Sequence, residues 1–292
     1  MLAAPALAGA EPLTVDAHIH LFEPARFPYH SKAVYRPAAS PLDPYLKFAR
    51  SAGIAHVVIV HPEPYQDDHR YLEYCFEHES PRGLFKGTCL FDPLDSATPQ
   101  RLADLVKKWP DRIVALRVHA MNPPGAPFEK TGPIENRDLG DPAMTRAWAA
   151  AAKLGLAVQM HFLPHHAPAI GKLAAEFRDM PVILDHMGRA GQGSAADAEE
   201  VLRLAKLPRV FFKFSGVGYS SKQKAPYADA KPFVRRALAE FGADRILWGG
   251  LGHNAKENQD ARAVFDAMFG DLRPADAAKI RGANAARLFR WA

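Results

Sequence analysis

Eight short apolar runs, separated by segments of helical period, constrain this chain more than any other feature of its sequence. The runs are rich in β-branched and aromatic residues and predict buried strands over 14–19, 56–60, 84–90, 113–118, 157–160, 182–184, 210–214 and 246–248. Between them, apolar residues recur at spacings of three and four, which predicts helices over 42–52, 68–78, 99–109, 142–153, 168–177, 196–205, 230–241 and 259–269.

Strict alternation of strand and helix favours a parallel sheet with right-handed crossovers, and eight repeats close such a sheet into a barrel. We therefore expect one (β/α)₈ TIM barrel of α/β class over residues 13–292, with a last helix over 276–290 across the barrel floor. A doubly wound open sheet is the alternative. A glycine-rich phosphate loop is missing after the first run, which argues against nucleotide-binding forms of either fold.

Residues 1–12 are set apart from the barrel. Residues 1–10 are small and apolar and end in Ala8-Gly9-Ala10, like the end of a secretory signal that lacks its charged start. We interpret this segment as a leader or the remnant of a signal peptide. The protein would then be periplasmic or secreted, and otherwise cytoplasmic.

The composition of the chain limits the classes of molecule that it is expected to bind. The formal charge is +5, but the basic residues are spread along the chain rather than clustered as in a nucleic-acid-binding face. We expect small anionic molecules to be bound, and not nucleic acid. We expect no binding to a membrane either, since 18 continuous apolar residues occur nowhere.

Cys75 and Cys89 lack metal-type spacing and are expected to pack as small hydrophobes. The oligomeric state stays open.

The most informative polar residues are His18 and His20, at the end of the first predicted strand. Two residues apart on a strand, their side chains point the same way, here into the barrel mouth. Two imidazoles together can ligate a metal or hydrogen-bond a substrate carbonyl, although a strand pair satisfied by its neighbours is the plainer interpretation.

Further polar residues follow other strands. They are His61, Arg117, His119, His161, Asp185, His186 and Arg189. In an α/β barrel the loops after the strands form the active face, so the long loops over 22–44 and 122–142 are predicted to be substrate walls. The candidate wall residues are Tyr29, Tyr35, Arg36 and Phe128.

Together these residues carry a family resemblance. His18-x-His20, Gln159-Met160-His161, the segment 185–189 and the segment 244–249 resemble the amidohydrolase superfamily. Segments 22–29 and 60–65 are similar to the branch that contains 2-pyrone-4,6-dicarboxylate lactonase and related sugar lactonases. That branch has members that work without metal.

The resemblance implies a hydrolase in which histidines of strands one and six polarise a lactone carbonyl. His18, His20 and His186 match that set. Arg117 and Arg189 stand where arginines would hold substrate carboxylates, which suits the planar guanidinium, although Arg117 could instead form an ion pair inside the barrel.

We also expect the substrate to contact Tyr35, His161 and Glu63. The resemblance further implies an aspartate after strand eight that takes a proton from water.

One departure from the family pattern bears on that proton transfer. The family shows Trp-Gly-(Ser or Thr)-Asp-Trp-Pro-His after strand eight, whereas residues 248–254 read Trp-Gly-Gly-Leu-Gly-His-Asn. Leu251 falls where the aspartate belongs and can neither accept a proton nor ligate a metal. His253 is the nearest replacement base, and Glu63 a more distant one. We therefore expect no metal cofactor, with zinc held by His18, His20 and His161 as the alternative.

Three functions fit these observations. The first is a hydrolase that opens the ring of a carboxylated lactone. The second is a lactone isomerase or decarboxylase on the same scaffold. The third is a degenerate barrel that only binds its ligand, because it lacks the strand-eight aspartate.

Overall fold

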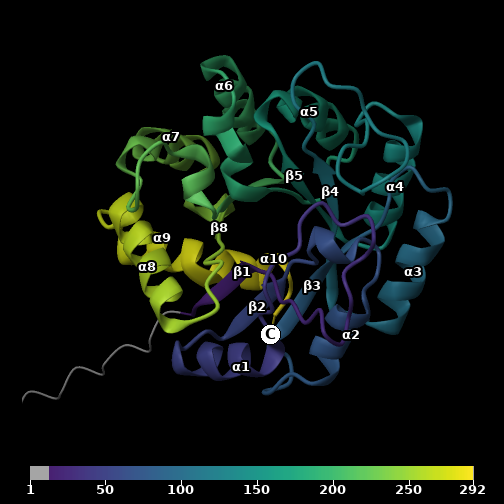
Figure 1. Ribbon diagram of the computed structural model, residues 1–292. Coiled ribbons are helices and arrows are strands. Elements are labelled where there is room, and N and C mark those ends of the chain that lie inside the picture. Colours follow the sequence, from purple (N-terminus) through teal and green to yellow (C-terminus); the bar gives the residue numbers. More distant parts are fainter. Residues whose placement is uncertain (1–12, 292) are drawn as a thin grey trace, which may run out of the picture.

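The computed structural model describes residues 13–291, so the predicted leader lies outside the described residues. The strands of the described chain form one parallel sheet of eight in the order β1 to β8, with the helices around it (Figure 1). They are β1 Val15–Ile19, β2 His56–Ile59, β3 Phe85–Leu90, β4 Ile113–Ala120, β5 Ala157–Phe162, β6 Val182–Leu184, β7 Val210–Phe214 and β8 Ile246–Trp248. The predicted (β/α)₈ barrel is confirmed, and the open sheet is not what forms.

Residues just after β8 bring the two ends of the sheet together. The Leu251 backbone N–H donates to the carbonyl oxygen of His18 at 3.2 Å. The Gly250 N–H donates to Asp16 Oδ1 at 2.9 Å. The last strand is thereby held against the first, next to the predicted histidine pair.

The principal helices pack their apolar faces on the outside of the strands. They are α1 Leu42–Ser51, α2 Arg70–Glu77, α3 Thr98–Lys108, α4 Pro142–Lys153, α5 Ala167–Glu176, α6 Ala195–Arg203, α7 Lys231–Phe241 and α8 Ala255–Phe269. Short 3₁₀ turns lie at Glu63–Tyr65, Pro164–His166, Asp185–Gln192, Leu204–Lys206, Val217–Ser220, Ala228–Ala230 and Ala243–Arg245. Helix α8 begins four residues earlier than predicted, because the Asn254 side chain caps it by accepting from the Glu257 N–H.

Side chains inside the barrel change character along its axis. An apolar cluster fills the amino-terminal part and contains Val15, Ala17, Val58, Val60, Ala115, Ala157, Ile183, Phe211 and Leu247. Two residues further along β4, β5 and β7 stand Arg117, Gln159 and Lys213, all buried. The interior therefore becomes polar and charged toward the carboxyl ends of the strands.

The C-terminal segment closes the barrel floor, as predicted. It is broken into α9 Pro274–Ala278, a π turn Lys279–Ala283 and α10 Asn284–Leu288, instead of one helix (Figure 1). Ala285 and Phe289 join the interior apolar cluster. Gly282 permits this approach, since a Cβ there would lie 2.0 Å from the Leu13 carbonyl oxygen. Among the described residues, none of the helices combines the length and apolar character needed to cross a membrane.

Candidate active site

His18 and His20 lie together at the carboxyl end of β1. Their Nε2 atoms are 3.2 Å apart, and the ring centroids are 4.9 Å apart. The pairing of β1 with β2 shifts register between Asp16 and Ile19, at the residues that turn into the mouth. His18 is completely buried, whereas His20 is partly exposed.

Hydrogen bonds fix which nitrogen of His20 carries a proton. Its Nδ1 lies 2.7 Å from the Val60 carbonyl oxygen, and because a carbonyl only accepts, Nδ1 must donate. In the neutral ring Nε2 is therefore unprotonated, and it faces His18 Nε2. Burial lowers the pKa of His20 to about 3 and the pKa of His18 well below its usual value. Both rings are therefore neutral at pH 7.

The turn after β6 places two further residues of the site. His186, Met187, Gly188 and Arg189 have φ of 50°, 59°, 61° and 47°, in the left-handed region. For residues other than glycine this region costs about 1–2 kcal/mol each. Gly188 is needed for packing as well, since a Cβ there would lie 2.8 Å from Val201 Cγ1. A turn of this kind persists only where the surrounding structure imposes it, which is typical of functional sites.

His186 completes a cluster of three imidazoles. Its ring centroid is 4.5 Å from that of His18, although the two residues lie far apart in the chain. Nδ1 of His186 is 3.0 Å from the Ser215 hydroxyl. Burial lowers the pKa of His186 well below its usual value, so this ring is neutral too. The predicted convergence of His18, His20 and His186 is present in the structure.

Comparison with known proteins agrees with this barrel. A family model described as Amidohydrolase matches residues 15–291. The chain belongs to the amidohydrolase family. A 4-sulfomuconolactone hydrolase of Rhizobium radiobacter is 31% identical over 240 residues, covering 80% of this chain and 73% of that protein.

Two further matches extend the comparison. A 2-pyrone-4,6-dicarboxylate hydrolase of Comamonas testosteroni is 27% identical over 80% of this chain and 75% of its own length. A solved structure of a probable 2-pyrone-4,6-dicarboxylic acid hydrolase from Acinetobacter baumannii, with citric acid bound, has a TM-score of 0.76 at 19% identity. That match covers 95% of this chain and 99% of the other, and it shows the fold. This amidohydrolase is therefore an enzyme of the superfamily that the sequence resembles.

Beneath the histidines of this amidohydrolase, Asp185 joins side chains from three strands. Its Oδ2 accepts from Gln159 Nε2 at 3.0 Å and from Arg117 Nε at 3.3 Å. Its Oδ1 lies 3.1 Å from Lys213 Nζ and 3.5 Å from His18 Nδ1. Burial alone would raise the pKa of Asp185, but Lys213, His18 and Arg117 hold it well below its usual range.

The Asp185 network changes the interpretation of two residues. Arg117 was predicted to hold a substrate carboxylate. Instead, two of its nitrogens contact the buried Asp185. Lys213 was not among the predicted site residues. The signal for it was a charged residue inside the apolar run Val-Phe-Phe-Lys-Phe of β7, in step with the inward-facing Phe211.

Arg189 lies beside His161 and His119 at the mouth. Its Nε and Nη2 lie 3.1 and 2.9 Å from His161 Nε2, and its guanidinium stacks 4.2 Å from the Tyr219 ring centroid. Neither ring nitrogen of His119 has a hydrogen-bond partner among the described residues, and the same holds for His161 Nδ1. Arg189 itself is partly exposed on this side of the mouth.

Glu63 and Tyr35 belong to the rim rather than to the histidine cluster. The buried Glu63 carboxylate accepts from the Val34 N–H at 3.1 and 3.2 Å and from the Gln66 amide. Burial raises the pKa of Glu63 to about 7. Glu63 thus holds the loop after β1, which carries Tyr35 with 46% of its surface exposed.

The other predicted wall residues lie on the same loops. Tyr29 donates its hydroxyl proton to the Pro37 carbonyl, and Arg36 donates to the His30 carbonyl. Phe128 is 43% exposed. His61 lies lower, with Nε2 donating to the Gln66 carbonyl at 2.9 Å.

His253 faces the backbone of the first strand. Its Nε2 lies 2.6 Å from the His20 carbonyl oxygen and so carries the proton, while its Nδ1 is 3.4 Å from Glu257. Its role as the base therefore stays a prediction, and this geometry favours positioning of His20. Leu251, with φ of 59°, turns the chain at this point.

The metal site expected as an alternative does not match the contacts. Within the described chain, the residues whose ligand atoms lie within 4.8 Å of one another are His18, Asp185 and His186. The third ligand predicted from the sequence is His161, and its Nε2 is already hydrogen-bonded to Arg189. Both Asp185 oxygens already face basic or amide side chains. A divalent metal at His18, Asp185 and His186 would therefore have to displace Lys213 from Asp185.

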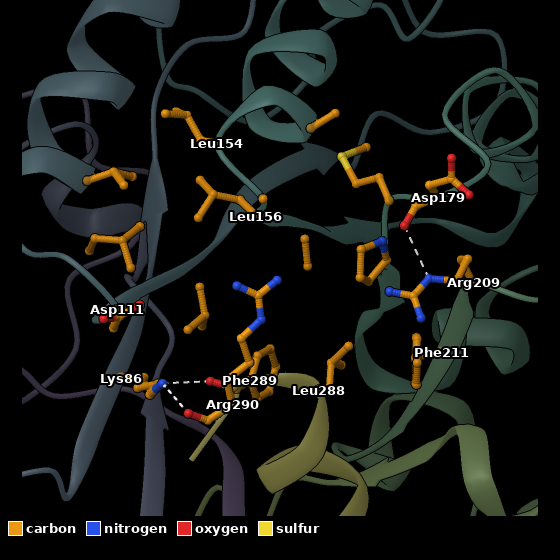
Figure 2. Close-up of a pocket in the computed structure, with 18 of the residues that line it drawn as sticks. Lys86, Asp111, Leu154, Leu156, Asp179, Arg209, Phe211, Leu288, Phe289 and Arg290 are labelled. Atoms are coloured by element: carbon orange, nitrogen blue, oxygen red, sulfur yellow. Dashed lines mark hydrogen bonds between the residues drawn. The ribbon is translucent and has the colours of Figure 1, made fainter. Parts of the chain in front are cut away.

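Two of the larger cavities among the described residues lie at opposite ends of the barrel. One of about 550 Å³ lies under the barrel floor, where Lys86 donates to the carbonyls of Phe289 and Arg290 (Figure 2). Another of about 520 Å³ lies outside the ends of β7 and β8 and is lined by Tyr227 and Leu251. Because it also reaches Ser215, this second cavity adjoins the mouth.

Proposed function

We propose that this amidohydrolase hydrolyses the ring ester of a small lactone that carries an acidic group. The observation that carries the proposal is the convergence of neutral His18, His20 and His186 in the barrel mouth beside Arg189. Two of the relatives are named as hydrolases of acidic lactones, which supports the same reaction class. The substrate would be a small anion.

Arg189 is the residue we assign to the acidic group of the substrate. Its guanidinium is partly exposed and is positioned by Tyr219 and His161. A carboxylate or sulfonate could accept two hydrogen bonds from this planar group.

We assign different roles in ester hydrolysis to the neutral histidines. The Ser215 hydroxyl can donate to His186 Nδ1, which leaves Nε2–H of His186 to polarise the lactone carbonyl. His20 Nε2, unprotonated and partly exposed, accepts a proton as water attacks the carbonyl carbon. The ring C–O bond then breaks and the leaving oxygen takes that proton. Asp185, beside His18, stabilises the positive charge that develops on the histidine pair.

The test uses a panel of lactones in ¹⁸O-labelled water. We expect carboxylated or sulfonated unsaturated lactones to open with one labelled oxygen in the product. The His186→Ala variant should lose about 10²- to 10³-fold in kcat, as for loss of a carbonyl-polarising donor. His78→Ala, on an exposed ring stacked on Tyr74, is the matched control.

Other outcomes would identify the alternatives. Conversion without uptake of labelled oxygen would indicate an isomerase. Tight binding of the lactones without turnover would indicate a barrel that only binds.

A further inference from the structure

We propose that Lys213 supplies, from inside the barrel, the positive charge that a divalent metal would otherwise supply below the histidines. The catalytic half of this proposal rests on the function proposed above, while the metal-binding half does not. Lys213 is completely buried and does not reach substrate, so it would be a positioning residue.

The geometry places the Lys213 charge next to the reacting groups. Its Nζ is 3.1 Å from Asp185 Oδ1, and the same oxygen is 3.5 Å from His18 Nδ1. One carboxylate oxygen thus links the ammonium group to the histidine cluster. These three side chains are completely buried, so water screens their interaction little.

Two cations share the carboxylate below the histidines. Asp185 is shared by Lys213 and Arg117, two cations for one carboxylate. Asp16 is the other acidic group that acts on Lys213. The Asp16 carboxylate is also occupied, since it accepts from the N–H groups of His18 and Gly250.

A buried cation linked to the histidine cluster has a direct use in ester hydrolysis. Negative charge develops on the carbonyl oxygen as water adds, and a fixed cation nearby stabilises it without reorganisation. A metal ion in this place would do the same. Here a metal held by His18, Asp185 and His186 would have to displace Lys213 from Asp185 and sit beside two fixed cations.

The experiment compares Lys213→Met with Lys86→Met in protein freed of metal by chelation. Lys86 is a buried lysine of the same barrel that binds backbone carbonyls at the opposite end, so its removal controls for loss of a buried ammonium. Zn²⁺ and Mn²⁺ are titrated by calorimetry. We expect wild type and Lys86→Met to show no stoichiometric binding, and Lys213→Met to bind one ion per chain.

The kinetic arm uses the lactone that wild type hydrolyses best. We expect Lys213→Met without metal to lose about 10²-fold in kcat, as for loss of one preorganised electrostatic group, with a much smaller change in KM. Lys86→Met should keep the wild-type kcat.

Several results would overturn the proposal. Stoichiometric metal binding by wild type would do so, as would a folded Lys213→Met that gains no metal or keeps the wild-type kcat. If Lys213→Met fails to fold, Lys213→Gln takes its place, and the wild-type titration still tests the proposal. If wild type opens no lactone, the proposed function fails, while the metal titrations still decide this inference.

Discussion

Asp185 shows how much of this site depends on the surroundings of one residue. It follows β6 directly, and its carboxylate points below the histidines, where Lys213, Arg117, Gln159 and His18 meet it. A buried carboxylate stabilises the fold through its ion pairs. Removal of the carboxylate leaves buried cations without a counter-charge, which is strongly destabilising.

The Asp185→Asn variant should therefore lose about 3–5 kcal/mol of the free energy of unfolding, because two buried cations lose their counter-charge. Urea unfolding followed by circular dichroism measures this loss. Asp260→Asn, on an exposed pair with Lys256, is the control and should change stability by less than about 1 kcal/mol. Equal stability of the two variants would contradict the importance of the network.

Glu63 is expected to make the stability of the fold depend on pH. Burial raises its pKa to about 7, above the ordinary value of a glutamate, so the folded state binds its proton more tightly than the unfolded chain does. The stabilisation from this group is complete below about pH 4.3 and is lost as pH rises through 7.

We expect the wild-type melting temperature, relative to that of Glu63→Gln, to fall between pH 5 and pH 8. Thermal unfolding of both proteins across this range is the measurement. A difference that stays constant with pH would refute the assignment to Glu63.

At the scale of elements, the left-handed turn after β6 places Asp185 and His186 in different layers. One residue turns down into the charged interior and the next points up into the mouth. Gly188 lies in the turn with φ of 61° and is packed against Val201 and Phe162.

The Gly188→Ala variant tests this packing. It should lose more stability than Gly53→Ala, which has a similar φ of 65° but nothing within 4 Å of the added Cβ. We expect about 1–2 kcal/mol for the left-handed strain in both variants, and about 1–3 kcal/mol more for Gly188→Ala from overpacking. Denaturant melts of the two variants give the comparison, and equal losses would show that the turn can shift without cost.

For the whole molecule, the barrel is closed at the floor by residues from the end of the chain. Phe289 is 3% exposed and packs into the apolar interior cluster below the charged layer. The floor thus keeps water away from the side of the barrel opposite the histidines.

Truncation of Phe289 to alanine should cost about 3–5 kcal/mol by loss of buried apolar surface and creation of a cavity. Phe128→Ala, on a ring that is 43% exposed, should cost far less. Chemical denaturation compares the two. A small loss for Phe289→Ala would mean that the C-terminal segment is not needed to close the barrel.

Local patterns of the sequence were sufficient to predict the barrel. Strand and helix periods depend on residues a few positions apart, so the eight strands, their order and the closing C-terminal segment could be predicted without knowledge of any contact. The pairing of His18 with His20 follows from the same period of two.

Roles that depend on distant neighbours needed the tertiary structure. Arg117 and Arg189 each follow a strand in the sequence and were predicted to have the same role. In the structure, Arg117 pairs with the buried Asp185, whereas Arg189 faces the mouth. The direction of His253 and the burial of Lys213 beside Asp185 were likewise decided by folding. The sequence by itself therefore determined the (β/α)₈ barrel and which end of it carries the histidines. Only the tertiary structure decided which charges face substrate and which are buried, because charge pairing depends on contacts between residues far apart in the chain.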